Sequence, residues 1–194
     1  MVNEVVFRKG VRVSLRPIER GDIPMMHRWF NDPEVTQFLA RTFPLYETEE
    51  EEWVENLSKS KTSFPLGIVT IQDPKLIGTV GLHEINWQQR TATTATIIGE
   101  KDYWGRGYGT EAKMLLLDFA FNALDLFAVL SRVIASNGRS LAYARKCGYE
   151  EVGRLPQWFR CQDGQRRDQV LLMVTQEKWR PLWIEYLQKT ATIL

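Results

Sequence analysis

The chain has 194 residues, which is the size of one domain and long enough to bury a substantial hydrophobic core. Hydrophobic residues make up 44% and charged residues 25%, as in soluble globular proteins, and the formal net charge of +1 does not favour nucleic acid as the main partner. No segment approaches the ~18 apolar residues of a membrane helix, and the start of the chain lacks the apolar stretch of a signal peptide. We therefore expect a cytoplasmic protein that binds neither nucleic acid nor membrane.

The cysteines and histidines do not indicate a metal site. Cys147 and Cys161 form no Cys-x-x-Cys or Cys/His pattern, and they are too few for a disulfide framework. The only histidines are His27 and His83, and a lone histidine usually packs or lies on the surface. We expect no metal and no Ser-His-Asp triad.

The first elements expected are a strand and two helical segments. Alternating apolar and polar residues from 11 to 15 predict a half-buried strand, which Pro17 ends. Asp22 is a candidate N-cap of a helix that the Asn-Asp-Pro sequence at 31–33 stops. A short helical piece is expected over 33–39.

An acidic segment follows, in which Thr48 and Glu51 have the spacing of a capping box and predict a third helix. The carboxylates of this segment are either a solvated face that offsets the helix dipole or an acidic rim that attracts a cationic substrate. They are Glu47, Glu49, Glu50, Glu51, Glu52 and Glu55.

Three strands are expected next. The apolar patterns over 66–71 and 76–85 predict two strands joined by a proline-containing turn at 72–75. A third strand over 92–99 leads into a glycine-rich stretch. The order of hairpins makes this part of the sheet antiparallel.

The glycine-rich stretch reads Tyr-Trp-Gly-Arg-Gly-Tyr-Gly-Thr-Glu-Ala from Tyr103 to Ala112. Glycine permits positive φ and places no Cβ between backbone and ligand, so that successive N–H groups can point into one concavity at a helix start. This arrangement is suited to binding phosphate.

A crossover unit follows the glycines. Apolar residues at helical spacing predict a helix from Gly109 or Thr110 to about Leu126, and the run 129–135 predicts a strand. A turn at 136–138 leads into a short helix over 139–146. A right-handed crossover of this kind places the strands before and after the long helix side by side and parallel.

The end of the chain predicts a hairpin and a final helix. Strands over 150–161 and 167–175 are joined by a turn at 162–165. One apolar face of the last helix either docks on its own domain or seals a homodimer. That face contains Trp179, Leu182, Trp183, Tyr186 and Leu187.

Two common phosphate-binding loops fit the glycine stretch poorly. A P-loop ends in Gly-Lys-Ser/Thr, whereas Gly109 is followed by Thr110 and Glu111. A dinucleotide loop needs a third glycine where Thr110 stands, and an acid at the end of the next strand, where Ser136 and Asn137 lie.

The chain resembles the GCN5-related N-acetyltransferase (GNAT) superfamily, and in particular the branch with ribosomal-protein alanine N-acetyltransferases and spermidine N-acetyltransferases. The pieces that resemble the family occur in the family's order over about 11–179. They are Leu15-Arg16-Pro17, Trp29 to Pro33, Ile77 to Leu82, Tyr103 to Ala112, Asn137 to Ser140, Gly148-Tyr149 and Asp163-Gly164.

The resemblance implies an α+β (α/β) fold. We expect one acetyltransferase domain over 1–194, with a core at 11–176 and a C-terminal helix at 177–190. Its sheet is expected to be mixed, mostly antiparallel and of about seven strands, with a central parallel pair that splays apart, and to be flanked by helices.

The resemblance also implies acetyl-CoA as cosubstrate, with pantetheine between the splayed strands and the pyrophosphate on the glycine loop. The family often has Gln or Arg where this chain has Trp104, so a side-chain contact to phosphate is missing there. The implied CoA-binding residues are Ile97, Ile98, Gly99, Trp104, Gly105, Arg106, Gly107, Tyr108, Gly109, Thr110, Asn137 and Ser140.

The catalytic residues depart from the commoner family pattern. Many members use a Tyr as the acid where Ala144 stands, and the neighbouring Tyr143 would point about 100° away from that position on a helix. Ser140 matches the acid of some N-terminal acetyltransferases and is therefore the expected proton donor, with Asn137 beside it. Members often carry a Glu at the position assigned to Thr93. Glu84 on the preceding strand is the nearest acidic alternative as base, and it can equally be a surface carboxylate.

The expected activity is acetyl transfer to a primary amine, first a protein or peptide N-terminal α-amino group. At neutral pH an α-amino group is already partly neutral and needs only a weak base. The alternatives are a small cationic amine, which is a polyamine or an amino-sugar antibiotic, and a non-catalytic acyl-CoA-binding module. A nucleotide-phosphate binder is a third class.

Overall fold

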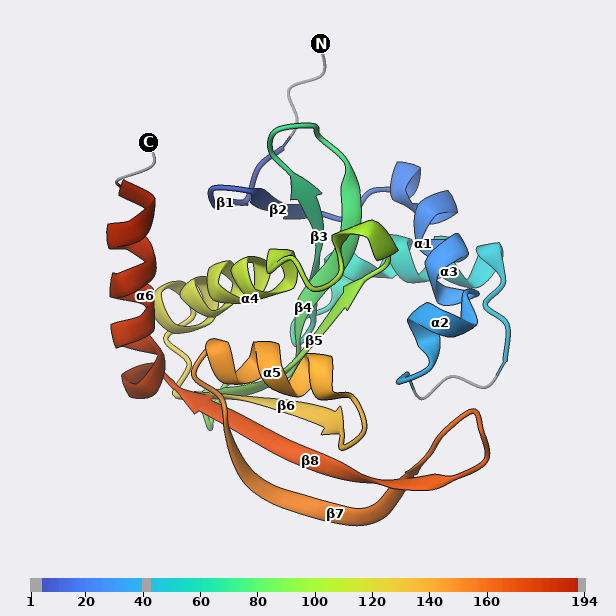
Figure 1. The fold of residues 1–194 in the computed structure, drawn as a ribbon. Coiled ribbons are helices and arrows are strands. Elements are labelled where there is room, and N and C mark those ends of the chain that lie inside the picture. Colours follow the sequence, from blue (N-terminus) through green and yellow to red (C-terminus); the bar gives the residue numbers. More distant parts are fainter. Residues whose placement is uncertain (1–4, 40–42, 192–194) are drawn as a thin grey trace.

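A computed structural model describes residues 5–39 and 43–191, which form one eight-stranded sheet flanked by helices (Figure 1). The expected mixed, mostly antiparallel sheet is confirmed. It has one more strand than expected because a two-residue strand precedes the first predicted one and pairs with it. In spatial order the strands are β1 (Arg8–Lys9), β2 (Val13–Pro17), β3 (Phe64–Thr70), β4 (Leu76–Asn86), β5 (Thr91–Ile98), β6 (Ala128–Ile134), β8 (Arg166–Thr175) and β7 (Glu150–Arg160).

The central parallel pair, β5 and β6, is joined over only part of its length. Thr91 to Thr93 pair with Ala128 to Leu130, and all other neighbouring strands are antiparallel. Both strands continue beyond this ladder, β5 to Ile98 and β6 to Ile134. The pair therefore splays apart, as expected.

The helices follow the predicted order. They are α1 (Ile23–Phe30), α2 (Pro33–Thr36), α3 (Glu47–Asn56), α4 (Tyr108–Asp118), α5 (Gly138–Lys146) and α6 (Gln176–Ala191). In Figure 1, α4 and α5 lie over the same face of the sheet, on either side of the splayed strands.

Several helix boundaries differ from the prediction. The piece expected over 33–39 ends at Thr36, and the long helix begins at Tyr108, one residue before Gly109. The third helix begins at Glu47, one residue before Thr48, and no side chain caps it, so the capping-box reading was wrong. The long helix ends at Asp118 and continues as a π-helical turn over Phe119–Ala123, because its backbone bonds shift there to a wider spacing.

Alternate residues of the strands supply two separate cores. Ile68 of β3 points into the main core, where it packs with α4, while the next residue, Val69, joins a second cluster with Met26 and Trp29 of α1. The period of two along a strand produces this division. The sheet is therefore covered on both faces, and α1 is fixed behind the strands that form the site.

The carboxylates of the acidic helix α3 are exposed except at one position. Glu50 is only 2% exposed, and its Oε2 lies 2.9 Å from His27 Nδ1 of α1. The carboxylates of Glu47, Glu49, Glu51, Glu52 and Glu55 are exposed. The solvated-face interpretation therefore fails at Glu50.

Helix α6 docks on its own domain. Trp179 is fully buried and stacks on Trp183, which stacks on Tyr186, with ring centres 5.3 and 5.1 Å apart. Leu187 is 47% exposed and does not join this face. Among the residues that the structure describes, no helix has the length and apolar character needed to cross a membrane.

Candidate functional site

A cavity of about 400 Å³ opens between β5, β6, the glycine loop and α5. Its lining joins residues far apart in the sequence, from α2 and the segment after it to α5. The lining residues are Val35, Phe38, Leu39, Thr94 to Ile98, Tyr103, Trp104, Gly105, Gly107, Gly109, Thr110, Ser131 to Ile134, Asn137, Arg139, Ser140, Ala142, Tyr143 and Lys146.

The two walls of the cavity begin where the β5–β6 ladder ends. The last paired residues are Thr93 and Leu130, and the residues that follow them, 94–98 and 131–134, all line the cavity. The backbone groups on the facing edges of these segments have no strand partner across the gap. An extended ligand with amide groups could satisfy them as an additional strand would.

The glycine loop forms one end of the cavity. Gly105 and Gly107 have φ values of +71° and +84°, which glycine adopts without strain, and Gly107 is the N-cap of α4. No side chain caps α4. Its first N–H groups, which have no acceptor within a helix, are therefore free to bind an anion.

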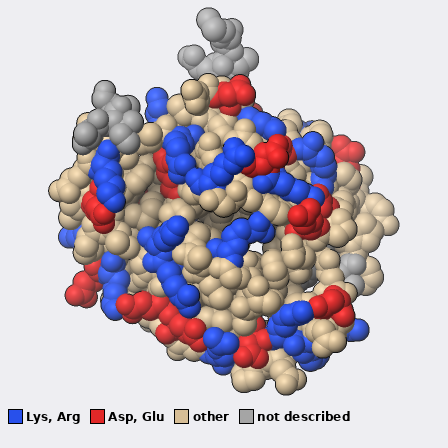
Figure 2. Space-filling model, viewed as in Figure 1, with Lys and Arg blue, Asp and Glu red and all other residues tan. Residues whose placement is uncertain are grey.

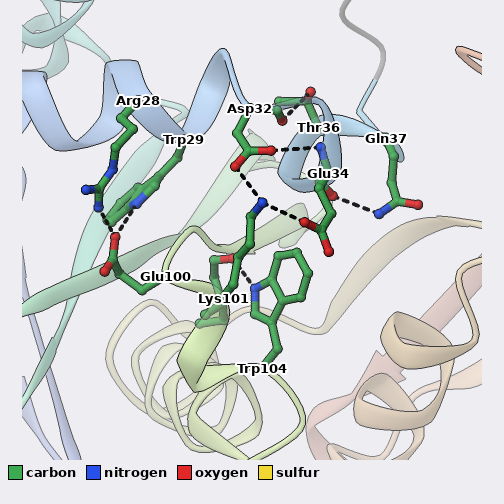
Figure 3. A network of polar contacts seen from close by, with 10 residues as sticks. Arg28, Trp29, Asp32, Glu34, Thr36, Gln37, Glu100, Lys101 and Trp104 are labelled. Carbon is green, nitrogen blue, oxygen red and sulfur yellow. Dashed lines mark hydrogen bonds and ion pairs between the residues drawn. The ribbon is translucent and has the colours of Figure 1, made fainter.

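Contacts with β5 and with helices α1 and α2 hold this loop in place (Figure 3). The indole of Trp104 donates from Nε1 to the carbonyl of Ile98 at 2.6 Å. Lys101 Nζ lies 2.8 Å from the carboxylate of Asp32 and 2.6 Å from that of Glu34. These bonds fix the loop relative to α2, whose neighbouring residues line the other end of the cavity.

A second set of bonds joins Glu100, at the start of this loop, to α1 and to the turn before β4. Glu100 accepts from Trp29 Nε1 at 2.8 Å and from Lys75 Nζ at 2.5 Å, and it also pairs with Arg28. Burial raises the pKa of Glu100, but the bonds from Lys75 and Trp29 and the charge of Arg28 outweigh it, so that this pKa lies below its ordinary value. The carboxylate is therefore charged at neutral pH and structural.

Arg12 contacts both the glycine loop and the start of α4. Its Nη1 donates to the carbonyl of Arg106 at 2.8 Å, its Nε lies 3.1 Å from Glu111 Oε2, and its guanidinium lies over the Tyr108 ring. Glu111 is 5% exposed and also accepts from Tyr186 of α6 at 3.0 Å. The start of α4 is thus tied to the bend before β2 and to α6.

Helix α5 borders the cavity opposite the glycine loop. Asn137 caps this helix by accepting from the backbone N–H of Ser140 at 3.0 Å. The guanidinium of Arg139 lies 4.0 Å from the centre of the Trp104 ring, a cation–π contact that bridges α5 and the loop.

The charged side chains of the cavity have one sign. Of the described residues, those with charge that line it are Arg132, Arg139 and Lys146, and none is a carboxylate. Figure 2 shows Lys and Arg side chains around the hollow near the centre of this face. The lining therefore suits an anionic ligand.

The structure brings most of the expected CoA-binding residues to this cavity. The residues that line it are Ile97, Ile98, Trp104, Gly105, Gly107, Gly109, Thr110, Asn137 and Ser140. Three others lie beside the lining. Gly99 packs against Trp29, whose ring would lie 2.0 Å from a Cβ, while Arg106 offers its carbonyl to Arg12 and the Tyr108 ring contacts Tyr103.

The expected base does not line the cavity. Glu84 lies where the pairing of β4 with β5 shifts register, has a φ of +51°, and its side chain is 61% exposed. Its Oε2 lies 3.6 Å from Arg132 Nη2. This position agrees with a surface carboxylate paired with a cavity arginine.

The strand before the glycine loop presents a different threonine from the one expected. Thr93 donates to the carbonyl of His83 and is absent from the lining, whereas Thr94 lines the cavity. Its Oγ1 accepts from Lys113 Nζ of α4 at 2.5 Å. In the sequence, the sign of this pair is Lys113, a charged residue within a helix whose residues from 111 to 117 are all buried.

The tyrosine set aside from the sequence also reaches the cavity. Tyr143 lines it, while Ala144 is 2% exposed in the core, so the expectation that position 143 points away from the site was wrong. Burial raises the pKa of Tyr143 to about 12. The hydroxyl is therefore protonated at neutral pH.

Within residues 5–39 and 43–191, no cluster of three or more His, Cys, Asp or Glu side chains could hold a metal ion. Burial raises the pKa of the Cys147 thiol to about 12, so it is not a thiolate at neutral pH.

Comparisons with known proteins agree with this geometry. The model of the acetyltransferase (GNAT) domain family matches residues 12–150. Spermidine N(1)-acetyltransferase of Vibrio cholerae is 26% identical over 168 residues, which cover 87% of this chain and 95% of that protein. The Bacillus subtilis protein named Probable N-acetyltransferase YjcK is 35% identical over 156 residues, which cover 75% of this chain and 84% of that protein.

A solved structure resembles most of this chain. The crystal structure of spermidine N-acetyltransferase from Vibrio cholerae in complex with CoA and spermine has a TM-score of 0.81 and 25% identity. The match covers 87% of this chain and 98% of that chain.

Proposed function

Because the chain belongs to the GNAT acetyltransferase family, we propose that it transfers the acetyl group of acetyl-CoA to a primary amine of a small polycation of the polyamine class. The observation that carries the proposal is the cavity itself. The unpaired edges of β5 and β6 and the uncapped start of α4 meet there, and its charged lining is basic.

Acetyl-CoA fits this cavity by its chemistry. Its pantetheine amides would bond the backbone edge of β5 near Ile97 and Ile98, where the Ile98 carbonyl also accepts from Trp104 Nε1. Its pyrophosphate would accept from the N–H groups at Tyr108, Gly109 and Thr110, where the helix dipole adds a favourable potential. Arg139 supports this placement, because it brings a cationic side chain to the loop position where Trp104 itself offers no charge.

The transfer needs a donor for the oxyanion and a proton for the departing thiolate. Backbone N–H groups of β5 beyond the end of the ladder would stabilise the oxyanion. Ser140 would protonate the sulfur, since it lines the cavity and its own N–H is held by the Asn137 cap. Asn137 would act as a positioning residue. The proposal leaves out Glu84 as base, because it is exposed and paired with Arg132.

The relatives favour a polyamine over the peptide N-terminus that the sequence alone put first. Two spermidine N(1)-acetyltransferases, of Vibrio cholerae and Escherichia coli, are 26% and 29% identical to this chain. The exposed carboxylates of α3 would attract a polycation to the surface.

One observation favours a peptide α-amino group as the second candidate. The described cavity residues on the side of α2 are Val35, Phe38 and Leu39, which are apolar and supply no carboxylate for a second cationic centre. An acceptor with a single amine and an apolar neighbour suits such a lining.

The experiment is a comparison of acceptors at equal concentration. Release of free CoA thiol from acetyl-CoA would be followed with spermidine, spermine and peptides that carry a free N-terminus, and N-acetylated peptides would serve as controls. We expect the largest kcat/KM with a polyamine. A larger kcat/KM for the free peptides would show that the acceptor is a peptide α-amino group and not a polyamine. No turnover with any primary amine would refute the proposed activity.

A further inference from the structure

Lys113 is an ionisable side chain placed inside the core beside the cavity. It lies in the second turn of α4 and is 1% exposed. Its Nζ donates to Thr94 Oγ1 at 2.5 Å, and among the described residues no carboxylate forms an ion pair with it. A buried ammonium without a counter-ion is costly, so this environment favours the neutral amine.

The groups around Lys113 do not supply the missing negative charge. Helix α5 and the residues after it contribute Tyr143, Cys147 and Tyr149, and the two tyrosine ring centres lie 5.9 Å from Nζ. Burial raises the pKa of each of these groups, so all three are neutral at pH 7.

The remaining titratable neighbour is His83 on β4. Burial lowers its pKa, the charge of Lys113 lowers it further, and Glu84 raises it. Its Nδ1 lies 2.8 Å from Ser63 Oγ, and a neutral histidine adds no negative charge. Burial correspondingly lowers the pKa of Lys113 to about 7.

Thr94 connects this amine with the cavity. It is the first residue of β5 beyond the ladder with β6, and it lines the cavity while its Oγ1 is bonded to Nζ. A hydroxyl can accept one proton and release another at the same time. The bond therefore forms a path for a proton from the cavity to a buried amine.

We propose that Thr94 and Lys113 together accept the proton of the attacking amine, with Thr94 in contact with the substrate and Lys113 acting through it as a positioning and proton-storing residue. This inference rests on the proposed function. The pair would supply a base on β5, the strand on which the sequence resemblance led us to look for a glutamate. This role is compatible with Ser140 as the proton donor to sulfur.

The steps balance in protons and electron pairs. The substrate reacts as the neutral amine: its nitrogen forms a bond to the acetyl carbon and gives one proton to Thr94 Oγ1. Thr94 passes its own hydrogen to the lone pair of the neutral Nζ, so that in the reacting state the hydroxyl is the donor in the bond between these two groups. The C–S bond breaks, and sulfur leaves with the electron pair and takes the hydroxyl hydrogen of Ser140. After product release Lys113 returns its proton to solvent and Ser140 is reprotonated.

The test is the pH dependence of kcat and kcat/KM for the wild type and for Lys113→Met, Thr94→Val and Thr94→Ser. Methionine keeps the length of lysine and suits a buried site, and Met114→Leu on the same helix is the matched control. In the wild type we expect the rate to rise through a midpoint near pH 7.

Lys113→Met and Thr94→Val should lose that midpoint and about a hundredfold in kcat, with affinity for acetyl-CoA unchanged. Thr94→Ser should restore most of the rate, and Met114→Leu should behave as the wild type. A midpoint that comes from the substrate amine would persist in every variant. Retention of both the rate and the midpoint near pH 7 in Lys113→Met would overturn the inference while leaving the proposed function intact.

A second measurement separates the two failures. If the wild type acetylates no amine, the proposed function fails, and an NMR titration of the Lys113 Cε resonance, assigned with Lys113→Met, still tests the neutral amine. A titration midpoint of the Lys113 amine near pH 7 would support Lys113 as a proton acceptor. A midpoint near the ordinary value of 10.5 would refute it.

Discussion

Arg139 lies across the mouth of the cavity from the glycine loop, with its guanidinium 4.0 Å from the centre of the Trp104 ring. The contact places a positive charge beside the loop that leads to the backbone N–H groups at the start of α4. Replacement of Arg139 by Met should weaken CoA binding about tenfold, because one charge-assisted contact to phosphate is lost. Isothermal titration calorimetry with CoA measures this directly.

Arg145 on the same helix is the matched control, since it is exposed and does not line the cavity. Arg145→Met should bind CoA as the wild type does. Equal affinity of both variants would show that Arg139 only packs on Trp104.

Ser140→Ala should lower kcat by about a hundredfold, the lower end of what a general acid contributes, and leave CoA affinity within about twofold. Tyr143→Phe, prepared in parallel, tests the other hydroxyl of the cavity. A large loss of kcat in Tyr143→Phe together with normal turnover of Ser140→Ala would transfer the role to the tyrosine.

Gly99→Ala should destabilise the fold, although the sequence resemblance assigned this glycine to CoA. A Cβ there would meet the Trp29 ring at 2.0 Å, a closeness that forces Trp29 or the strand to move and costs about 2 kcal/mol. Thermal unfolding measures the loss. Gly21→Ala, where no atom lies within 4 Å of the added Cβ, is the control, and equal melting temperatures of the two variants would contradict the packing role.

The free energy of unfolding should rise with pH above neutrality because of Lys113. Its pKa is about 7 in the folded protein, below the ordinary 10.5, so the unfolded chain binds more protons between these values. Stability is then lowest below pH 7 and increases toward pH 10, by about 2 kcal/mol between pH 7 and 9. Urea unfolding of wild type and Lys113→Met over this range isolates the contribution, which should vanish in the variant. Parallel curves would show that the lysine is charged in the fold.

Local patterns predicted most of the fold. The strand β2, the glycines before α4 and the turn into α5 each depend on neighbours in the sequence, and each lies within two residues of its expected place. The capping-box interpretation of Thr48 failed because the helix began one residue earlier, a difference that local propensity does not resolve.

The chemistry of the site was harder to predict, since it depends on contacts between distant elements. A one-residue difference on β5 decides whether Thr93 or Thr94 lines the cavity, because Thr93 is the last residue paired with β6 and Thr94 is the first one beyond that ladder. The bond between Thr94 and Lys113 and the contact between Trp104 and Arg139 each join two elements whose distance only the fold determines.

A crystal structure of the protein with CoA tests the central claim most directly. We expect pantetheine between β5 and β6, bonded to the backbone beyond Thr93, and the pyrophosphate at the N–H groups of Tyr108 to Thr110. CoA bound elsewhere, with the space between the two strands empty, would contradict the account.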